Sequence, residues 1–137
     1  MIGLILIIIT LIGFYIIYQL KLQSLKYKNK QDKEKLEKFI IHNKESEIKQ
    51  HSHFLYLFTE HCNACNRFNS LLCQILEHNK NIPLIIKNCS TQNCIECTQN
   101  IQFPCLKFID KQKNQEIKYQ GNFKIKEIEH FLKKKFL

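Results

Sequence analysis

The sequence contains no tryptophan and a single arginine, Arg67, although its formal net charge is +9. The positive charge comes from lysines, many of which follow the N-terminal apolar run or lie close to the C-terminus. Direct readout of bases relies on arginines and on aromatic side chains interleaved with basic ones, and neither pattern is present. This composition argues against a nucleic-acid partner.

Charged side chains are also missing between Ile2 and Leu20. A helix over these residues would rise about 28 Å, close to the hydrocarbon thickness of a bilayer. A cleaved signal peptide would need a basic start, a shorter apolar core and a small-residue cleavage site, and the sequence has none of them. We therefore predict a transmembrane anchor at residues 1–20, in contact with membrane lipid through residues 2–20 and the flanking lysines.

Lysines follow this apolar run from Lys21 to Lys38 and are mixed with a few acidic residues. Juxtamembrane lysines attract anionic lipid and favour the cytosolic side of a membrane. We expect a single-pass membrane protein with its soluble domain in the cytosol. The lumenal side stays open, because seven cysteines are compatible with an oxidising compartment. Residues 21–50 are predicted to form a basic helical linker, with an amphipathic helix at 33–42.

The remaining residues, 51–137, alternate between apolar segments of strand periodicity and of helix periodicity. In chain order we expect a strand at 53–59, a helix at 63–77, a strand at 82–87, a weakly helical stretch at 90–100, strands at 105–109 and 116–119, and a helix after Gly121. Two strands joined through a helix should be parallel, and the last two strands should form a hairpin. This order predicts an α/β domain with a four-stranded mixed sheet flanked by helices.

The motif Cys62-Asn63-Ala64-Cys65 directly follows the first predicted strand. A Cys-x-x-Cys at a strand-to-helix junction places two sulfurs within bonding distance, and the helix N-terminus favours the thiolate. This chemistry indicates disulfide exchange, with Cys62 as the nucleophile and Cys65 as the more buried resolving cysteine. A protonated His61 would lower the pKa of Cys62 further, and a solvated surface imidazole is an equally good interpretation of this residue.

Residues 53–137 resemble the thioredoxin superfamily, in particular its thioredoxin and protein disulfide isomerase-like domains. The resemblance rests on four ordered features: Cys62-Asn63-Ala64-Cys65 after a strand, Ile101-Gln102-Phe103-Pro104 before a strand, Gly121 after the hairpin, and the closing amphipathic helix. It implies a thioredoxin-like fold in which Pro104 is the cis-proline and the backbone of Phe103 pairs with an extended substrate. It also implies a protein thiol-disulfide oxidoreductase that acts on protein dithiols or disulfides and needs no cofactor.

The sequence departs from the family at three positions near the motif. Glu60-His61 stands where a tryptophan is common, and Asn63-Ala64 matches none of the usual middle pairs. Tyr56 occupies the position of a carboxylate that many members bury. The missing carboxylate and tryptophan leave a redox-inactive, membrane-tethered interaction module as the non-enzymatic alternative. Reductase, oxidase and isomerase share the motif residues, so the direction of exchange stays open.

Three further cysteines, Cys89, Cys94 and Cys97, lie in one polar stretch. They either form a second disulfide, bind metal or have no function. The pairs Cys62/Cys65 and Cys94/Cys97 also have the elements of a tetrahedral zinc site, although an entire predicted helix and strand separate them. If the cysteines act in thiol-disulfide exchange, we expect no bound metal. Two other cysteines are expected to be buried thiols: Cys73 and Cys105.

Overall fold

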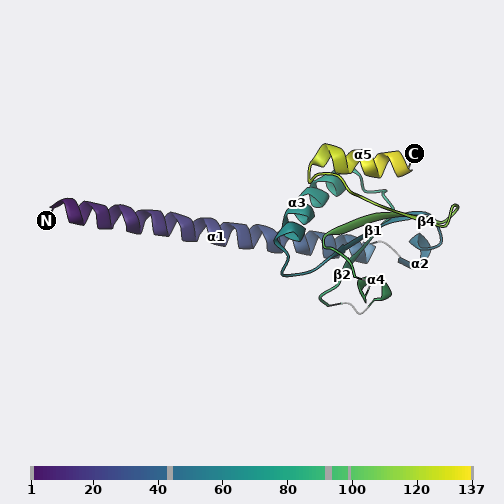
Figure 1. Cartoon of the computed structure of the whole chain (residues 1–137), viewed down its shortest axis with the longest axis horizontal. Coiled ribbons are helices and arrows are strands. Elements are labelled where there is room, and N and C mark those ends of the chain that lie inside the picture. The colour runs from purple at the N-terminus through teal and green to yellow at the C-terminus, as the bar shows by residue number, and fades with distance from the viewer. Residues whose placement is uncertain (1, 43–44, 92–93, 99, 137) are drawn as a thin grey trace. The chain divides into compact units, whose positions relative to one another are not determined.

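The computed structural model describes residues 2–42, 45–91, 94–98 and 100–136. The chain divides into two compact units, Met1–Gln31 and Asp32–Leu137. Helix α1 (Ile2–His42) is uninterrupted, so the boundary predicted at residue 20 lies inside a helix (Figure 1). A single helical turn, α2 (Glu45–Ile48), follows in the stretch that was expected to be a polar connection.

The first unit consists of the apolar part of α1, which exposes its large side chains. The exposed fractions of these side chains reach 73% at Phe14 and are still 49% at Ile8. By length and composition alone, the helical stretch Gly3–Phe39 is able to cross a membrane. An apolar surface of this kind is stable in a lipid environment and unfavourable in water.

The second unit contains a four-stranded mixed sheet with strand order β2-β1-β3-β4. Its strands are β1 (His53–Phe58), β2 (Leu84–Asn88), β3 (Cys105–Asp110) and β4 (Gln115–Lys118). β1 pairs in parallel with β2 and antiparallel with β3, and β3 and β4 form the hairpin. The predicted fold class is confirmed.

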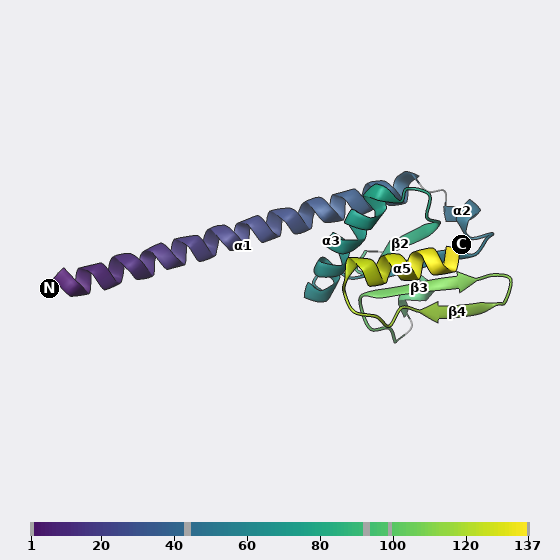
Figure 2. The same ribbon diagram turned by 90° about the horizontal axis from the view of Figure 1, so that it is seen from above.

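β1 is buried along its whole length, because helices cover both faces of the sheet. Helices α3 (Asn63–His78) and α5 (Ile125–Phe136) lie on one face (Figures 1 and 2). Alternate β1 residues, Phe54, Tyr56 and Phe58, point into the larger core on that face. Alternate β1 residues contribute to one face and those between them to the other, because successive side chains of a strand point in opposite directions.

The opposite face carries a smaller apolar cluster built on Leu55 and Leu57. Ile48 of α2 and Cys97 of α4 (Ile95–Thr98) pack against this cluster. Ile85 and Cys105 complete its buried part. The weak helix expected within residues 90–100 is thus a single turn.

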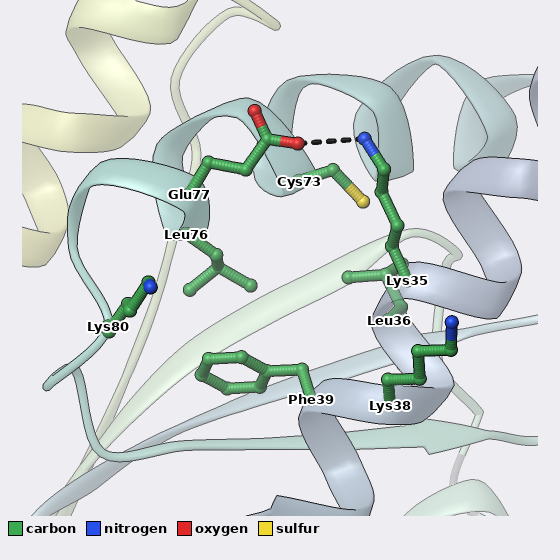
Figure 3. A pocket seen from close by; sticks show the side chains of 8 residues that line it. All are labelled: Lys35, Leu36, Lys38, Phe39, Cys73, Leu76, Glu77 and Lys80. Atoms are coloured by element: carbon green, nitrogen blue, oxygen red, sulfur yellow. Dashed lines mark hydrogen bonds and ion pairs between the residues drawn. The ribbon is translucent and has the colours of Figure 1, made fainter.

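The C-terminal part of α1 belongs to the second unit and packs against α3. Leu36 is 1% exposed and joins the larger core, as expected of an amphipathic helix at 33–42. A groove of about 660 Å³ with an apolar floor lies between the two helices, and Lys35 bonds to Glu77 at 2.7 Å across it (Figure 3). The buried Cys73 lines this groove, and burial raises the pKa of its thiol to about 12. The predicted burial of Cys73 is confirmed, and its raised pKa disfavours the reactive thiolate.

Candidate active site

Cys62 is the N-cap residue of α3, in extended backbone conformation. Its sulfur accepts a hydrogen bond from the backbone N–H of Cys65 at 3.0 Å, and its carbonyl accepts the next one from Asn66 at 3.0 Å. The Cα atoms of Cys62 and Cys65 lie 5.1 Å apart and the two side chains form a disulfide. A thiolate at this position would be stabilised by an N–H donor and by the positive end of the helix dipole.

The two cysteines differ in exposure. Cys65 is fully buried in the larger core, whereas Cys62 lies half-buried at its edge. An incoming sulfur can therefore reach Cys62 first, and the more buried position predicted for Cys65 is confirmed.

A groove of about 420 Å³ lies beside this dithiol. It is lined by Ala64 of the motif, by Phe103 and Pro104, and by the segment that joins β4 to α5. The Phe103–Pro104 peptide bond is cis. Phe123, 40% exposed, adds an aromatic wall. Of the predicted site residues, Phe103 and Pro104 line this groove together with Ala64 of the motif.

Tyr119 shapes the side of this groove that faces α5. Its backbone N–H donates to the carbonyl of Leu106 at 2.8 Å, and its hydroxyl donates to the carbonyl of Asn122 at 2.6 Å. A Cβ at Gly121 would lie within 2.8 Å of three atoms of the Tyr119 side chain. Any larger residue at position 121 would force the Tyr119 side chain to move, because the tyrosine lies so close to the backbone there. The sequence marked Gly121 but did not indicate the role of Tyr119.

Tyr56 occupies the buried position beneath the motif. Its hydroxyl donates to Asn69 Oδ1 at 2.5 Å, and its ring stacks between Phe58 and Phe68. Burial raises the pKa of Tyr56 well above its ordinary value, so the phenol stays neutral. Asn69 was missed in the sequence, where a polar residue at this helical position has no distinguishing signal. Tyr56 and Asn69 are therefore hydrogen-bonded to each other in the core, and neither supplies a charged base.

A polar network holds the segment that leads from β1 to Cys62. The Glu60 carboxylate accepts hydrogen bonds from Lys33 Nζ and from Asn88 Nδ2, the latter at 3.1 Å. The backbone N–H of Glu60 donates to Ser90 Oγ at 2.9 Å. The bond from Lys33, followed by that from Asn88, holds the pKa of Glu60 below its ordinary range. This network was not foreseen, because Lys33 is far from Glu60 in the sequence.

His61 is exposed, and its effect on Cys62 stays a prediction.

Three of the remaining cysteines form a second group. The sulfurs of Cys89, Cys94 and Cys97 all lie within 4.8 Å of one another and could serve as metal ligands. Within the described part of the chain, Cys62 and Cys65 do not join any such group. A zinc site built from both Cys-x-x-Cys pairs is therefore not formed, because the two pairs are carried by separate segments on different elements. Cys105 is buried in β3, as expected.

Comparison with known proteins identifies the fold. No protein-family model matches the chain, and no curated protein matches its sequence. The J-Trx1 fragment of ERdj5 superposes with a TM-score of 0.54 and 14% sequence identity, covering 61% of this chain and 41% of that structure. The chain has a thioredoxin-like fold. Zinc-bound human ERp44 is also similar, with a TM-score of 0.47 and 13% identity, covering 66% and 28% of the two chains. The chain thus spans less than half the length of each of these structures.

The Glu60 network predicts a specific pH dependence of stability. Because the folded state lowers the pKa of Glu60 from 4.5, the carboxylate stabilises the fold above that pH. This contribution is lost as the pH falls through the folded pKa. Glu60→Gln should lower the urea midpoint of the full chain at pH 7, and the difference from the parent should shrink as the pH falls through the folded pKa.

Glu34→Gln on the exposed face of α1 is the matched control, and its urea midpoint should follow the parent at every pH. If the urea midpoints of Glu60→Gln and the parent differed by the same amount at every pH, the charge of Glu60 would not stabilise the fold.

Proposed function

We propose that the chain is a protein thiol-disulfide oxidoreductase that works through Cys62 and Cys65. One observation carries the proposal: the N–H of Cys65 donates to the half-buried Cys62 sulfur at the N-terminus of α3. The same donor would stabilise the negative charge that Cys62 carries as a nucleophile or a leaving group. The thioredoxin-like fold supports this assignment.

The reaction needs no group beyond the two thiols. The Cys62 thiolate attacks one sulfur of a substrate disulfide, a mixed disulfide forms, and the other substrate sulfur leaves as a thiolate. Cys65, once deprotonated, attacks the Cys62 sulfur, closes the Cys62–Cys65 disulfide and releases the reduced substrate. The reverse sequence oxidises a substrate dithiol. The redox poise of the compartment decides which direction operates.

The groove beside Cys62 supplies the substrate site in this proposal. Its walls combine aromatic side chains with the backbone around Phe103 and Pro104. An extended protein segment would place its cysteine over Cys62 and pair its backbone with that of Phe103. The aromatic side chains of Phe103, Tyr119 and Phe123 would contact apolar side chains next to the substrate cysteine, and Gln102, Lys118 and Gln120 offer polar contacts in the same groove.

Substrate trapping tests this proposal. Cys65→Ser removes the resolving thiol, so mixed disulfides between Cys62 and client proteins should accumulate when the full chain is expressed. Cys62→Ser removes the nucleophile and should capture no clients, and it should reduce insulin turnover to background. Mass spectrometry after thiol blocking identifies the captured bond.

The matched control is Cys73→Ala, which removes a buried cysteine away from the motif and should keep insulin turnover close to that of the parent. A folded parent that turns over no insulin, together with a Cys65→Ser variant that captures nothing, would contradict the proposal. The chain would then be a redox-inactive interaction module.

We further propose that residues 2–20 anchor the protein in a membrane as a single-pass segment. The exposed apolar surface of this part of α1 supports the proposal, as does the absence of charge within it. The lysines from Lys21 onward favour a cytosolic domain, which would keep the Cys62–Cys65 disulfide transient.

The anchor is tested by alkaline carbonate extraction of membranes. The full chain should stay in the membrane pellet, and peptide mapping of that fraction should recover residues 2–20. Ile12→Lys places a charge in the middle of the apolar run, at a cost of about 3 kcal/mol for insertion, and should move protein to the supernatant.

Gln23→Lys, outside the run, is the control and should remain in the pellet. Recovery of the parent in the supernatant, or loss of residues 2–20 from the mature protein, would contradict a retained anchor.

A further inference from the structure

Three of the five cysteines outside the motif gather around one residue, Cys97. Cys97 lies in α4, with its Cα 5.4 Å from that of Cys89 and 5.2 Å from that of Cys94. Both separations fall within the range that disulfides require, about 4.4–6.8 Å. The backbone therefore places Cys97 within bonding distance of two partners, and all three sulfurs lie within 4.8 Å of one another.

Three cysteines cannot all be paired within one chain. A sulfur forms one disulfide, so a two-electron oxidation of this cluster always leaves one thiol next to the new bond. If Cys97 pairs with Cys89, Cys94 is free, and if Cys97 pairs with Cys94, Cys89 is free. The free thiolate can attack Cys97 Sγ and exchange one form for the other without any external oxidant.

The surroundings of the three residues are not equivalent. Cys89 and Cys97 pack against the apolar cluster of Leu55 and Leu57, and among the described residues Cys94 is not part of this packing. The next residue, Ile95, is 80% exposed. Burial of sulfur against apolar side chains favours the Cys89–Cys97 bond, because a neutral disulfide loses no charge solvation there. With this pairing, Cys94 is the thiol of the cluster that is left free to react.

Hydrogen bonds fix this cluster at the same sheet edge as the Cys62 motif. β1 and β2 are parallel neighbours, so the segments that follow them meet at one edge. The N–H of Cys89 donates to the carbonyl of Phe58 at 2.8 Å. The N–H of Glu60 donates to Ser90 Oγ at 2.9 Å. Cys89 is thus held by the strand that leads to Cys62, and only the segment from Cys94 to Cys97 has to adjust during exchange.

We propose that Cys89, Cys94 and Cys97 form a second thiol-disulfide exchange site, with Cys97 as the sulfur that changes partner. The site takes a small disulfide of the oxidised glutathione class. After the reaction, the Cys89–Cys97 disulfide packs against the apolar cluster and Cys94 is again a free thiol. This activity is independent of the Cys62–Cys65 pair.

The exchange balances in three steps. The Cys94 thiolate attacks one sulfur of the small disulfide, a mixed disulfide forms, and the other half leaves as a thiolate. The Cys97 thiolate attacks Cys94 Sγ, forms the Cys94–Cys97 disulfide and expels the second half. The Cys89 thiolate attacks Cys97 Sγ, forms Cys89–Cys97 and restores Cys94. Two electrons pass to the substrate, whose two thiolates take up the two protons that the cluster gives up.

Disulfide mapping tests the proposal on the full chain in detergent. Cys62→Ser and Cys65→Ser are both introduced, so the outcome does not depend on the function proposed for that pair. The reduced protein is treated with oxidised glutathione, blocked with N-ethylmaleimide, digested and mapped by mass spectrometry. We expect Cys89–Cys97 as the main disulfide and N-ethylmaleimide on Cys94.

Single variants in the same background distinguish the three roles. Cys89→Ser should shift the disulfide to Cys94–Cys97. Cys97→Ser should remove both the Cys94–Cys97 and the Cys89–Cys97 disulfide and leave glutathione on Cys94, because Cys97 is the thiol that resolves the mixed disulfide in this proposal. Cys73→Ala is the matched control and should reproduce the pattern of its parent. Circular dichroism checks that each variant is folded.

Two results would overturn the proposal. One is a folded chain in which glutathione forms no disulfide among the three cysteines. The other is one zinc ion per purified chain, bound to these thiolates and protecting all three from glutathione, since the cluster would then be a metal site.

Discussion

The hydrogen bond from the Cys65 N–H to the Cys62 sulfur links the chemistry of this protein to its fold. It exists because α3 begins at this point, and α3 begins there because its apolar residues pack against the sheet. A helix N-terminus leaves N–H groups without partners in the helix, and a sulfur that accepts one of them is favoured as a thiolate. Loss of the packing of α3 would remove the donor together with the fold.

The parallel pairing of β1 and β2 places both cysteine groups at one edge of the sheet. Cys62 follows β1, and Cys89 immediately follows β2. The segments after these strands are joined by the bonds of Glu60 to Asn88 and Ser90. The groups nevertheless pack against different apolar clusters, since Cys62 contacts the larger core and Cys89 the smaller one on the opposite face. One edge of the sheet thus carries two cysteine groups that pack against different apolar clusters.

Much of the fold could be predicted because it is encoded in local periodicity. The apolar run of β1, the helical spacing of α3 and the turn-rich hairpin each carry their own signal, and chain order then gives the strand pairing. Helical structure was predicted on both sides of residue 20, and the change in composition there does not end α1. Contacts over long sequence distances, such as Tyr56 with Asn69 and Lys33 with Glu60, leave no local pattern. The convergence of three cysteines on Cys97 likewise depends on tertiary structure.

The ionisation of Cys62 tests the central claim most directly. The reduced full chain is alkylated with iodoacetamide over a range of pH, and the rate at Cys62 is measured by peptide mass spectrometry. The same chain unfolded in urea serves as the reference. A thiolate stabilised by the N-terminus of α3 should give a midpoint below about 7.5 in the folded chain, against about 8.5 when unfolded. Equal midpoints in the folded and unfolded chain would contradict the account.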